Sequence, residues 1–561
     1  MVSKLVTSKC IWRSALLISL AVGCSGTPRT KDSPRPTDDT EADTEVDLVL
    51  VNGDIITPAG HRASLAIAGD RILPGEPPAT AKRTIDLGGK SVVIGLTDAH
   101  CHLYGLGTDL DNVSVRQLDS EAAVVEVVAR AAKSRAASEW LVGRGWDQNR
   151  WPGQQFPTKA SLDAAVGDRP VLLERVDGHA YWVNSRALAA AAITKDTKDP
   201  PGGKIVRDKR GEPTGVLVDN ATLLVDRAMP VASAEVRERR ILAAAKVAVG
   251  LGFTGVHEMG IDDATVAVYE KLAADKRLPL RVTAYLQGST VDPETLRTRK
   301  PIAPNADSLF AMPGVKFFAD GALGSRGARL YEDYDDDKGN RGLWVTEPAK
   351  LAAAVDAAVA GGWQTAIHAI GDAGVGSVLD AYTAALAKHP GDRRLRIEHT
   401  QVIAPNDIAR MVATHAIASM QPTHATSDMP WAEARIGRAR IKGAYAWRTM
   451  LDQKIPLAFG SDFPVEEVSP LLGLHAAIDR TDGKGNPAGG WYPEQKMTLD
   501  QAVAGFTTGA AFAAFAEDQS GTRADLTIFD GTLEPATILQ RKAIMTIVGG
   551  EIVFEDPEAH L

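Results

Sequence analysis

The chain has 561 residues and a mass of 59.5 kDa, and its 44% hydrophobic and 24% charged residues exclude a disordered chain, a collagen and a polytopic membrane protein. A formal net charge of −9, with no basic stripe, argues against nucleic acid as a partner. Three cysteines are too few for a disulfide framework or for a zinc site built from cysteines.

The first residues have the pattern of an export signal. Three basic residues (Lys4, Lys9 and Arg13) precede an apolar run at 15–22, which is too short to span a bilayer. The run ends in the sequence LAVGC at Cys24, which resembles the lipobox of bacterial lipoproteins. That resemblance implies that residues 1–23 are a signal peptide and that Cys24 is acylated. Ordinary signal cleavage beside an incidental cysteine is the alternative.

The next segment, residues 24–46, carries Ser, Thr, Pro, Asp and Glu and predicts a solvated tether. Cleavage before Cys24 removes three basic residues and leaves 59 basic against 71 acidic ones, a net charge of −12. A tethered acidic body favours an exported protein of the bacterial cell envelope, either periplasmic or in the outer membrane. The lipid at Cys24 is then its only membrane contact. A secreted protein is the alternative.

Short strand-like runs occur at both ends of the remaining chain. Residues 47–51 lead into the turn signal Asn52-Gly53, and further runs follow at 64–68 and 90–94. Similar runs lie near the C-terminus, at 525–529, 543–548 and 551–554. We therefore expect one small β-sandwich domain, built from residues 47–94 and 522–557.

Between these ends, helices alternate with strands. Residues 234–250 predict an alanine-rich helix before a strand at 254–257, and residues 348–360 predict a helix before a strand at 364–368. Thr498 and Gln501 form a capping-box pattern that opens a helix through residue 514. Such alternation predicts an α/β fold with a parallel sheet, and its length favours a (β/α)8 TIM-type barrel over residues 95–521. Residues from about 105 to 235 interrupt the pattern and predict an inserted subdomain that covers the barrel mouth.

Histidines and an aspartate end several of these strands. His100 and His102 follow the apolar run that starts at Val92, and because residues i and i+2 share a face, both imidazoles can point at one metal ion. His368, His399 and Asp462 end three other runs in the same way. A single histidine there is as easily a hydrogen-bonded core residue. The repeated placement instead predicts a metal site, because barrel active sites lie at the carboxyl ends of the strands.

Together these segments resemble the amidohydrolase superfamily. The similar stretches are IGLTDAHCH (94–102), GVKFFADGALGSR (314–326), AIHAIGD (366–372), RIEHTQ (396–401) and GSDFP (460–464). They are typical of its amidohydrolase-3 branch, which includes N-substituted formamide deformylases, and the resemblance covers nearly all of residues 47–555. It implies a (β/α)8 barrel with a terminal β-sandwich, one or two divalent metal ions, usually zinc, and a small-molecule substrate.

The same resemblance assigns the metal ligands. His100, His102 and Asp462 bind the more buried ion and His368 and His399 the second, while Lys316, carboxylated by CO2, bridges the two. A free lysine is a cation and a poor ligand, whereas its carbamate is an anion with two oxygens. The alternative for Lys316 is an ion pair with an acid such as Asp320.

A metal-dependent hydrolase is the leading hypothesis for the function. A bound metal ion lowers the pKa of water towards about 7, and Asp462 takes the water's proton and returns it to the leaving nitrogen. We expect an exported amidohydrolase that cuts C–N bonds of amide or N-formyl type. The alternatives are an esterase, lactonase or phosphoester hydrolase on the same site, and a non-catalytic metal-binding surface protein.

Five further residues are candidates for contact with the substrate. They are His179 and Trp182 in the insertion, Asp320 and Arg326 after Lys316, and His424. The alternative for His179 and Trp182 is local packing of the insertion, the alternative for Asp320 and Arg326 is support of Lys316, and His424 would contact either the substrate or the oxyanion. His257 also ends a predicted strand and is expected either to support the metal ligands from behind or to be structural. The sequence leaves the substrate, the metal ion and the oligomeric state open, a homo-oligomer included.

Overall fold

A computed structural model describes residues 46–561, except 79, 134–139, 306–307, 518–519 and 560–561. The predicted signal peptide, Cys24 and all but the last residue of the predicted tether therefore lie outside the described residues. Within the described part, no helix has both the length and the apolar character needed to cross a membrane.

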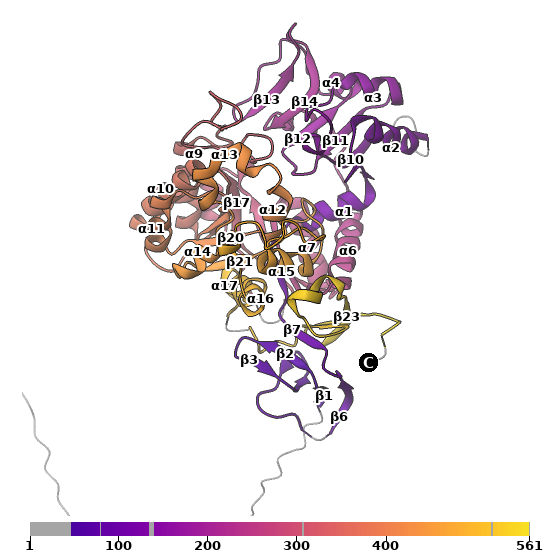
Figure 1. The fold of residues 1–561 in the computed structure, drawn as a ribbon, viewed down its shortest axis with the longest axis vertical. Helices are drawn as coiled ribbons and strands as arrows, with labels where there is room; N and C mark the ends of the chain where they lie inside the picture. Colours follow the sequence, from indigo (N-terminus) through magenta and orange to yellow (C-terminus); the bar gives the residue numbers. More distant parts are fainter. Residues whose placement is uncertain (1–45, 79, 134–139, 306–307, 518–519, 560–561) are drawn as a thin grey trace, which may run out of the picture. The chain divides into compact units, whose positions relative to one another are not determined.

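The central element is a sheet of eight strands in which all neighbouring pairs are parallel (Figure 1). Backbone hydrogen bonds also join its two edges, because the N–H of Asp462 donates to His100 O over 2.7 Å and the N–H of His102 donates to Phe463 O over 2.7 Å. The predicted (β/α)8 barrel is thus confirmed. Its strands are β8 (Thr97–Cys101), β15 (Gly255–Ile261), β16 (Arg281–Gln287), β17 (Phe310–Phe318), β18 (Gln364–Ala369), β19 (Arg396–His399), β20 (Ile417–Met420) and β21 (Leu457–Phe459).

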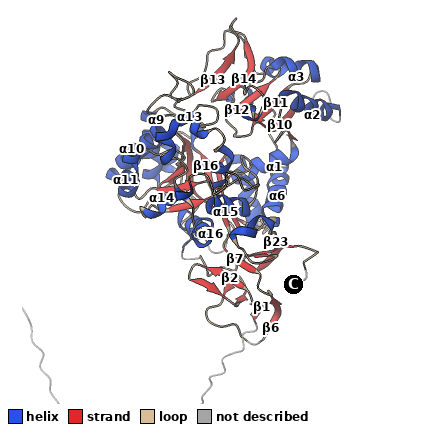
Figure 2. Cartoon of the chain, viewed as in Figure 1, coloured by secondary structure: helices blue, strands red, loops and turns tan. Residues whose placement is uncertain are grey.

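Helices connect these strands and bury apolar faces against them (Figure 2). The predicted capping box is present at Thr498 and Gln501, but the helix that it opens ends at Phe506, because Thr507 has non-helical backbone angles. A second helix starts at Thr508, so the single helix expected here is two. The helices are α6 (Ala234–Gly250), α7 (Asp263–Ala274), α8 (Pro293–Thr298), α9 (Pro348–Gly361), α10 (Asp372–Lys388), α11 (Pro405–Thr414), α12 (Pro422–Asp428), α13 (Ala432–Arg440), α14 (Trp447–Asp452), α15 (Pro470–Asp479), α16 (Leu499–Phe506) and α17 (Thr508–Ala513).

Two strand boundaries differ from the sequence prediction. The run from Val92 to His100 is not one strand, because Gly95 adopts a φ of +70° and turns the chain between β7 (Ser91–Ile94) and β8, which belong to different sheets. The strand expected to end at His257 continues as β15 to Ile261, which places His257 inside the barrel wall.

Strands from both ends of the chain share one sheet. β7 pairs with β2 and also, in antiparallel register, with β22, so that Val92 lies opposite Ile528. Apolar residues from both ends, among them Leu50, Ile55 and Ile547, form a common core. The boundaries given above for a β-sandwich domain stay a prediction. The strands are β1 (Val46–Val51), β4 (Leu65–Ala68), β5 (Arg71–Ile72) and β6 (Ala81–Asp86) in a four-stranded sheet, and β2 (Asp54–Thr57), β3 (Gly60–Arg62), β7, β22 (Leu526–Phe529), β23 (Ala543–Val548) and β24 (Glu551–Glu555) in a six-stranded one.

A further six-stranded sheet lies between β8 and β15 in the sequence, where the insertion was expected. Its core is mainly aliphatic and includes three tryptophans, with the rings of Trp146 and Trp151 packed near that of Trp182. His179 precedes β12, and its ring lies 5.1 Å from the ring of His368, so this sheet reaches the carboxyl ends of the barrel strands. The elements are α1 (Leu103–Asp111), β9 (Val113–Ser114), α2 (Glu121–Lys133), β10 (Leu141–Trp146), α3 (Lys159–Val166), β11 (Val171–Arg175), β12 (Ala180–Val183), α4 (Ser185–Ala190), β13 (Gly203–Arg207), β14 (Pro213–Asp219) and α5 (Leu223–Asp226).

Candidate metal centre

The structure brings the predicted ligands together at the carboxyl ends of the barrel strands. Asp462 Oδ1 lies 3.4 Å from His100 Nε2 and 3.2 Å from His102 Nε2. The His399 ring lies 4.8 Å from the His100 ring and 4.6 Å from the His368 ring. Lys316 Nζ lies 3.3 Å from His100 Nε2. All six side chains therefore surround one buried space, although they come from five different strands or strand ends.

Two groups of side chains have the spacing of a metal site. His100, His102 and Asp462 offer ligand atoms within 4.8 Å of one another, and so do His399, His424 and Asp462. The second group thus contains His424, and not His368, beside His399. The Nε2 atom of His368 instead lies 3.3 Å from Gly321 O, outside both groups.

Unpaired polar atoms show that these residues fit a cation. Asp462 Oδ1 and His424 Nε2 are buried and have no hydrogen-bond partner among the described residues. Each such atom costs about 1–3 kcal/mol, so its retention calls for a ligand. Burial and neighbouring positive charges lower the pKa of His368 and His399 well below the usual range, which keeps their imidazoles neutral. One carboxylate among neutral imidazoles is a donor set that suits zinc.

Backbone strain accompanies two of these residues. His399 has a φ of +73° and Asp462 a φ of +62°, which side chains other than glycine rarely adopt. The chain before Asp462 passes close to β8 at Gly460. Only a glycine fits there, because the Cβ of any other residue would lie 2.4 Å from His100 N. The strained positions thus coincide with the centre.

Hydrogen bonds at the far nitrogen fix the orientation of three imidazoles. When Nδ1 is held by a partner, Nε2 of the same ring is left to face the centre. The pairs are His100 Nδ1 with Glu398 Oε2 at 2.5 Å, His102 Nδ1 with Met259 O at 2.9 Å, and His399 Nδ1 with Gln421 Oε1 at 2.8 Å.

Lys316 is almost fully buried, and burial lowers its pKa to about 8. No ion pair of this lysine with an acid occurs in the described part of the chain. In particular, Asp320 accepts hydrogen bonds from the backbone N–H groups of Arg329, Ile370 and Gly371. The ion-pair alternative for Lys316 is therefore wrong for Asp320, and burial makes the neutral amine of this lysine more available than in a free lysine.

The structure gives three of the predicted substrate residues other roles. Trp182 is fully buried, and its indole N–H donates to Thr158 O within the core of the inserted sheet. Asp320 is also fully buried and holds backbone N–H groups, while Arg326 pairs with Asp336 at 3.0 Å. Neither Trp182 nor Asp320 has exposed surface in this structure, and their contact with a substrate stays a prediction.

His179 is placed differently. Its Nδ1 lies 2.7 Å from Asp219 Oδ1, and its ring faces His368. Burial lowers the pKa of His179, but the hydrogen bond and charge of Asp219 outweigh this effect and raise the pKa to about 9. The inserted sheet thus brings a positively charged imidazole to the edge of the centre.

Sequence reasoning missed the residues that support the ligands. Glu258 accepts the N–H of Leu103 over 2.5 Å and so anchors the start of α1 directly after His102. Asp98 accepts from the N–H and hydroxyl of Ser461 and links β8 to the end of β21. A signal was available for Asp98 and Glu398, because each lies one or two residues before a predicted metal ligand in a motif of the family.

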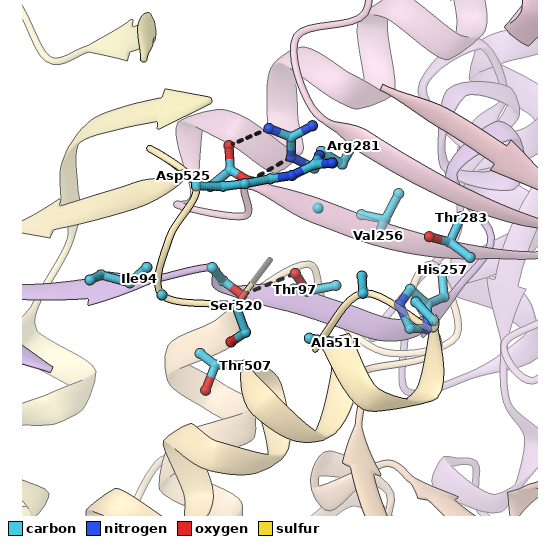
Figure 3. Close-up of a pocket in the computed structure, with 16 residues that line it drawn as sticks. Ile94, Thr97, Val256, His257, Arg281, Thr283, Thr507, Ala511, Ser520 and Asp525 are labelled. Atoms are coloured by element: carbon cyan, nitrogen blue, oxygen red, sulfur yellow. Dashed lines mark hydrogen bonds and ion pairs between the residues drawn. The ribbon is translucent and has the colours of Figure 1, made fainter. Parts of the chain in front are cut away.

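The cavity in Figure 3 lies at the other end of the barrel. It has a volume of about 90 Å³ and is lined by Thr97, Gly255 and Arg281, which are the first residues of their strands. Arg281 pairs with Asp525 across it (Figure 3). This cavity is therefore separate from the histidine centre.

Known proteins are similar to this chain in sequence and in fold. The pattern of the amidohydrolase family matches residues 83–554. The chain is 34% identical over 486 residues to the putative amidohydrolase YtcJ of Bacillus subtilis, which covers 84% of this chain and 90% of that protein. It is 25% identical over 550 residues to the N-substituted formamide deformylase of Arthrobacter pascens, which covers 91% and 98%.

A solved structure agrees with these matches. The crystal structure of an uncharacterized metal-dependent hydrolase from Pyrococcus horikoshii has a TM-score of 0.70 and 26% identity, and covers 87% of this chain and 98% of that one. The strand-end histidines, the closed barrel and the extent of the family match thus lead to one conclusion: this chain belongs to the amidohydrolase family and is a hydrolase.

Proposed function

We propose that the protein is an exported, metal-dependent amidohydrolase that cuts C–N bonds of amide or N-formyl type. One observation carries the proposal: Asp462 Oδ1 is buried without a hydrogen-bond partner among the described residues, within reach of His100 and His102. The similarity to a formamide deformylase supports the type of bond.

His100, His102 and Asp462 would hold the ion at the floor of the centre, and His399 with His424 or His368 would hold a second one. When bound, a divalent ion supplies a Lewis acid for the carbonyl and lowers the pKa of a nearby water. Neutral imidazoles and a carboxylate favour zinc.

Asp462 is the base in this scheme. Neighbouring imidazoles hold the pKa of its carboxyl well below the usual range, against the effect of burial, so the group is ionised at neutral pH. It takes a proton from the attacking water and then gives that proton to the leaving nitrogen, acting first as base and then as acid. His424 Nε2, 3.7 Å from Asp462 Oδ2, is positioned beside this transfer.

We also propose that Lys316 is carboxylated. The neutral amine nitrogen attacks CO2, a C–N bond forms, and one proton leaves, which gives a carbamate anion. Burial lowers the pKa of Lys316 to about 8, which raises the fraction of neutral amine at neutral pH above that of a free lysine. Labelling with ¹³CO2 should give a carbamate signal in the wild-type protein that is absent from Lys316→Arg.

The decisive experiment removes the metal and the base separately. Treatment with a chelator should abolish hydrolysis of N-alkyl formamides, and zinc should restore it. Asp462→Asn should lower kcat by about 10²–10⁴-fold. Asp168→Asn is the matched control, because Asp168 is an exposed partner of Arg186 and lies far from Asp462 in the sequence. This variant should keep wild-type activity.

A substrate panel separates the alternatives. Formamides and acyl-amino acids should be hydrolysed faster than lactones and phosphoesters. If only lactones were hydrolysed, the protein would be a lactonase and the proposed specificity for C–N bonds would be wrong. If the protein bound metal but hydrolysed no substrate, the result would support a non-catalytic metal-binding surface protein.

Export and lipid anchoring rest on the sequence pattern that ends at Cys24. Expression in a bacterium with radioactive palmitate should label the wild-type protein in the membrane fraction. Cys24→Ala should lose the label. Label on neither protein, with the wild type in the cytoplasm, would contradict both parts of the proposal.

A further inference from the structure

A buried charged pair lies directly beneath the metal centre. Arg396 and Glu398 occupy positions i and i+2 of β19, so both side chains point into the barrel, and both are fully buried. Buried ion pairs are expensive to desolvate and are poor evidence of a gain in stability. Stability alone therefore does not explain why Arg396 and Glu398 are buried here, and a role of this pair in the metal centre is a better explanation.

Arg396 is held from every side. Its Nε donates to Glu398 Oε1 over 2.7 Å, and its Nη2 donates to Glu398 Oε2 over 3.1 Å, so the pair is bidentate. Because an arginine is always charged, this geometry requires a carboxylate on Glu398. The remaining donors reach Ala99 O at 2.6 Å, Ser419 Oγ at 2.9 Å, Tyr285 Oη at 2.8 Å and His257 Nδ1 at 2.9 Å.

Glu398, held in place by Arg396, in turn contacts the predicted metal ligand His100. Its Oε2 lies 2.5 Å from His100 Nδ1. A carboxylate paired with arginine can only accept, so the hydrogen of the imidazole lies on Nδ1. In the neutral imidazole, Nε2 of His100 then carries the lone pair, and it faces Asp462 and Lys316, at 3.4 and 3.3 Å.

We propose that Glu398 is a positioning residue that fixes the tautomer and the orientation of His100, and that Arg396 holds Glu398 in place. The inference rests on the proposed function, since it presumes that His100 binds a metal ion. His102 provides the contrast within the same motif, because its Nδ1 meets the backbone carbonyl of Met259, a partner that no substitution removes. Of the two Nδ1 partners, Glu398 is therefore the one that a substitution can change.

Metal affinity is the first test. Glu398→Gln keeps the size of the side chain, and we expect the affinity for Zn²⁺, measured by competition with a chromophoric chelator, to fall about 10–100-fold. Trp182→Phe is the control for lost stability alone. It removes the hydrogen bond to Thr158 in the inserted sheet and should leave the affinity for Zn²⁺ within about twofold of wild type.

The tautomer is the second test, and it uses the metal-free wild-type protein. With ¹⁵N-labelled histidine, the signals assigned to His100 by a His100→Gln variant should show a hydrogen on Nδ1 and none on Nε2. A hydrogen on Nε2 would overturn the proposal, whether or not any Glu398 variant folds.

The outcomes separate this inference from the proposed function. A wild-type protein that binds no Zn²⁺ but shows the Nδ1–H tautomer contradicts the metallohydrolase and leaves the positioning of His100 intact. A folded Glu398→Gln variant with wild-type Zn²⁺ affinity overturns the positioning role. If Glu398→Gln fails to fold, Glu398→Asp, which keeps the charge and withdraws it from His100, should lose affinity in the same direction.

Discussion

Two histidine–carboxylate pairs in this molecule have the same length but different surroundings. The nitrogen–oxygen distance is 2.5 Å both in His100–Glu398, at the barrel floor, and in His61–Asp54, among the terminal strands. The first pair is 0% and 0% exposed, whereas the second is 44% and 29% exposed. Distance alone therefore does not mark a functional histidine.

The second nitrogen of each ring makes the difference. His61 Nε2 lies 3.3 Å from Asp500, another exposed carboxylate, so both of its nitrogens have ordinary partners. His100 Nε2 faces Asp462, whose Oδ1 has no hydrogen bond to any described residue. An imidazole held firmly on one side and facing an unsatisfied group on the other is what a ligand-binding site requires. His179–Asp219, at 2.7 Å and 17% and 1% exposed, is intermediate in burial.

The largest effect on stability is expected at the barrel floor. Arg396→Met leaves Glu398 buried without its cation, and we expect the free energy of unfolding to fall by about 3–5 kcal/mol. Urea unfolding measures this loss. The double variant Arg396→Met/Glu398→Met should recover part of it, because no unpaired charge is left. A loss below about 1 kcal/mol in the single variant would show that the buried pair at the barrel floor contributes no more to stability than the exposed pair of His61 and Asp54.

Much of this contrast could not be predicted from the sequence. Strand-end placement predicted that His100, His368 and Asp462 lie together, because parallel strands present their carboxyl ends at one face of a barrel. The bond from His100 to Glu398 joins residues 298 positions apart and depends on which strands face each other across the barrel interior. No local pattern contains that information.

Other differences from the sequence prediction have local causes. An aromatic residue beside a histidine suggested a substrate contact for Trp182, but tertiary packing with two further tryptophans buries it. The break at Gly95 was missed because the apolar pattern continues from β7 into β8, although the two strands belong to different sheets. Periodicity predicts that a segment is extended, not which sheet it joins.

The next largest effect concerns the intermediate pair. The pKa of His179 is raised to about 9 from 6.5, because the hydrogen bond to Asp219 outweighs burial. A raised pKa adds stability that is fully present below about pH 6.5 and is lost as the pH rises through about 9, and the shift corresponds to about 3 kcal/mol.

Asp219→Asn tests this pH dependence in the metal-free protein, where no added cation changes the charge balance. The difference in unfolding free energy between wild type and variant should be largest near pH 6 and should shrink above pH 9. A difference that grows with pH would contradict the assigned charge on His179.

The smallest effect is expected for the exposed pair. Asp54 also raises the pKa of His61, so the pH dependence has the same direction as for His179. The contribution of the pair to the unfolding free energy is present below about pH 6.5 and is lost as the pH rises through the raised pKa. Water screens this pair, which limits its contribution to less than about 1 kcal/mol. His61→Gln should therefore change urea unfolding slightly at pH 6 and hardly at pH 9, and it should leave Zn²⁺ affinity unchanged. If His61→Gln lost as much unfolding free energy as Asp219→Asn, burial would not determine how much each of the three histidine–carboxylate pairs stabilises the protein. The difference between the barrel floor and the terminal strands would then need another physical cause.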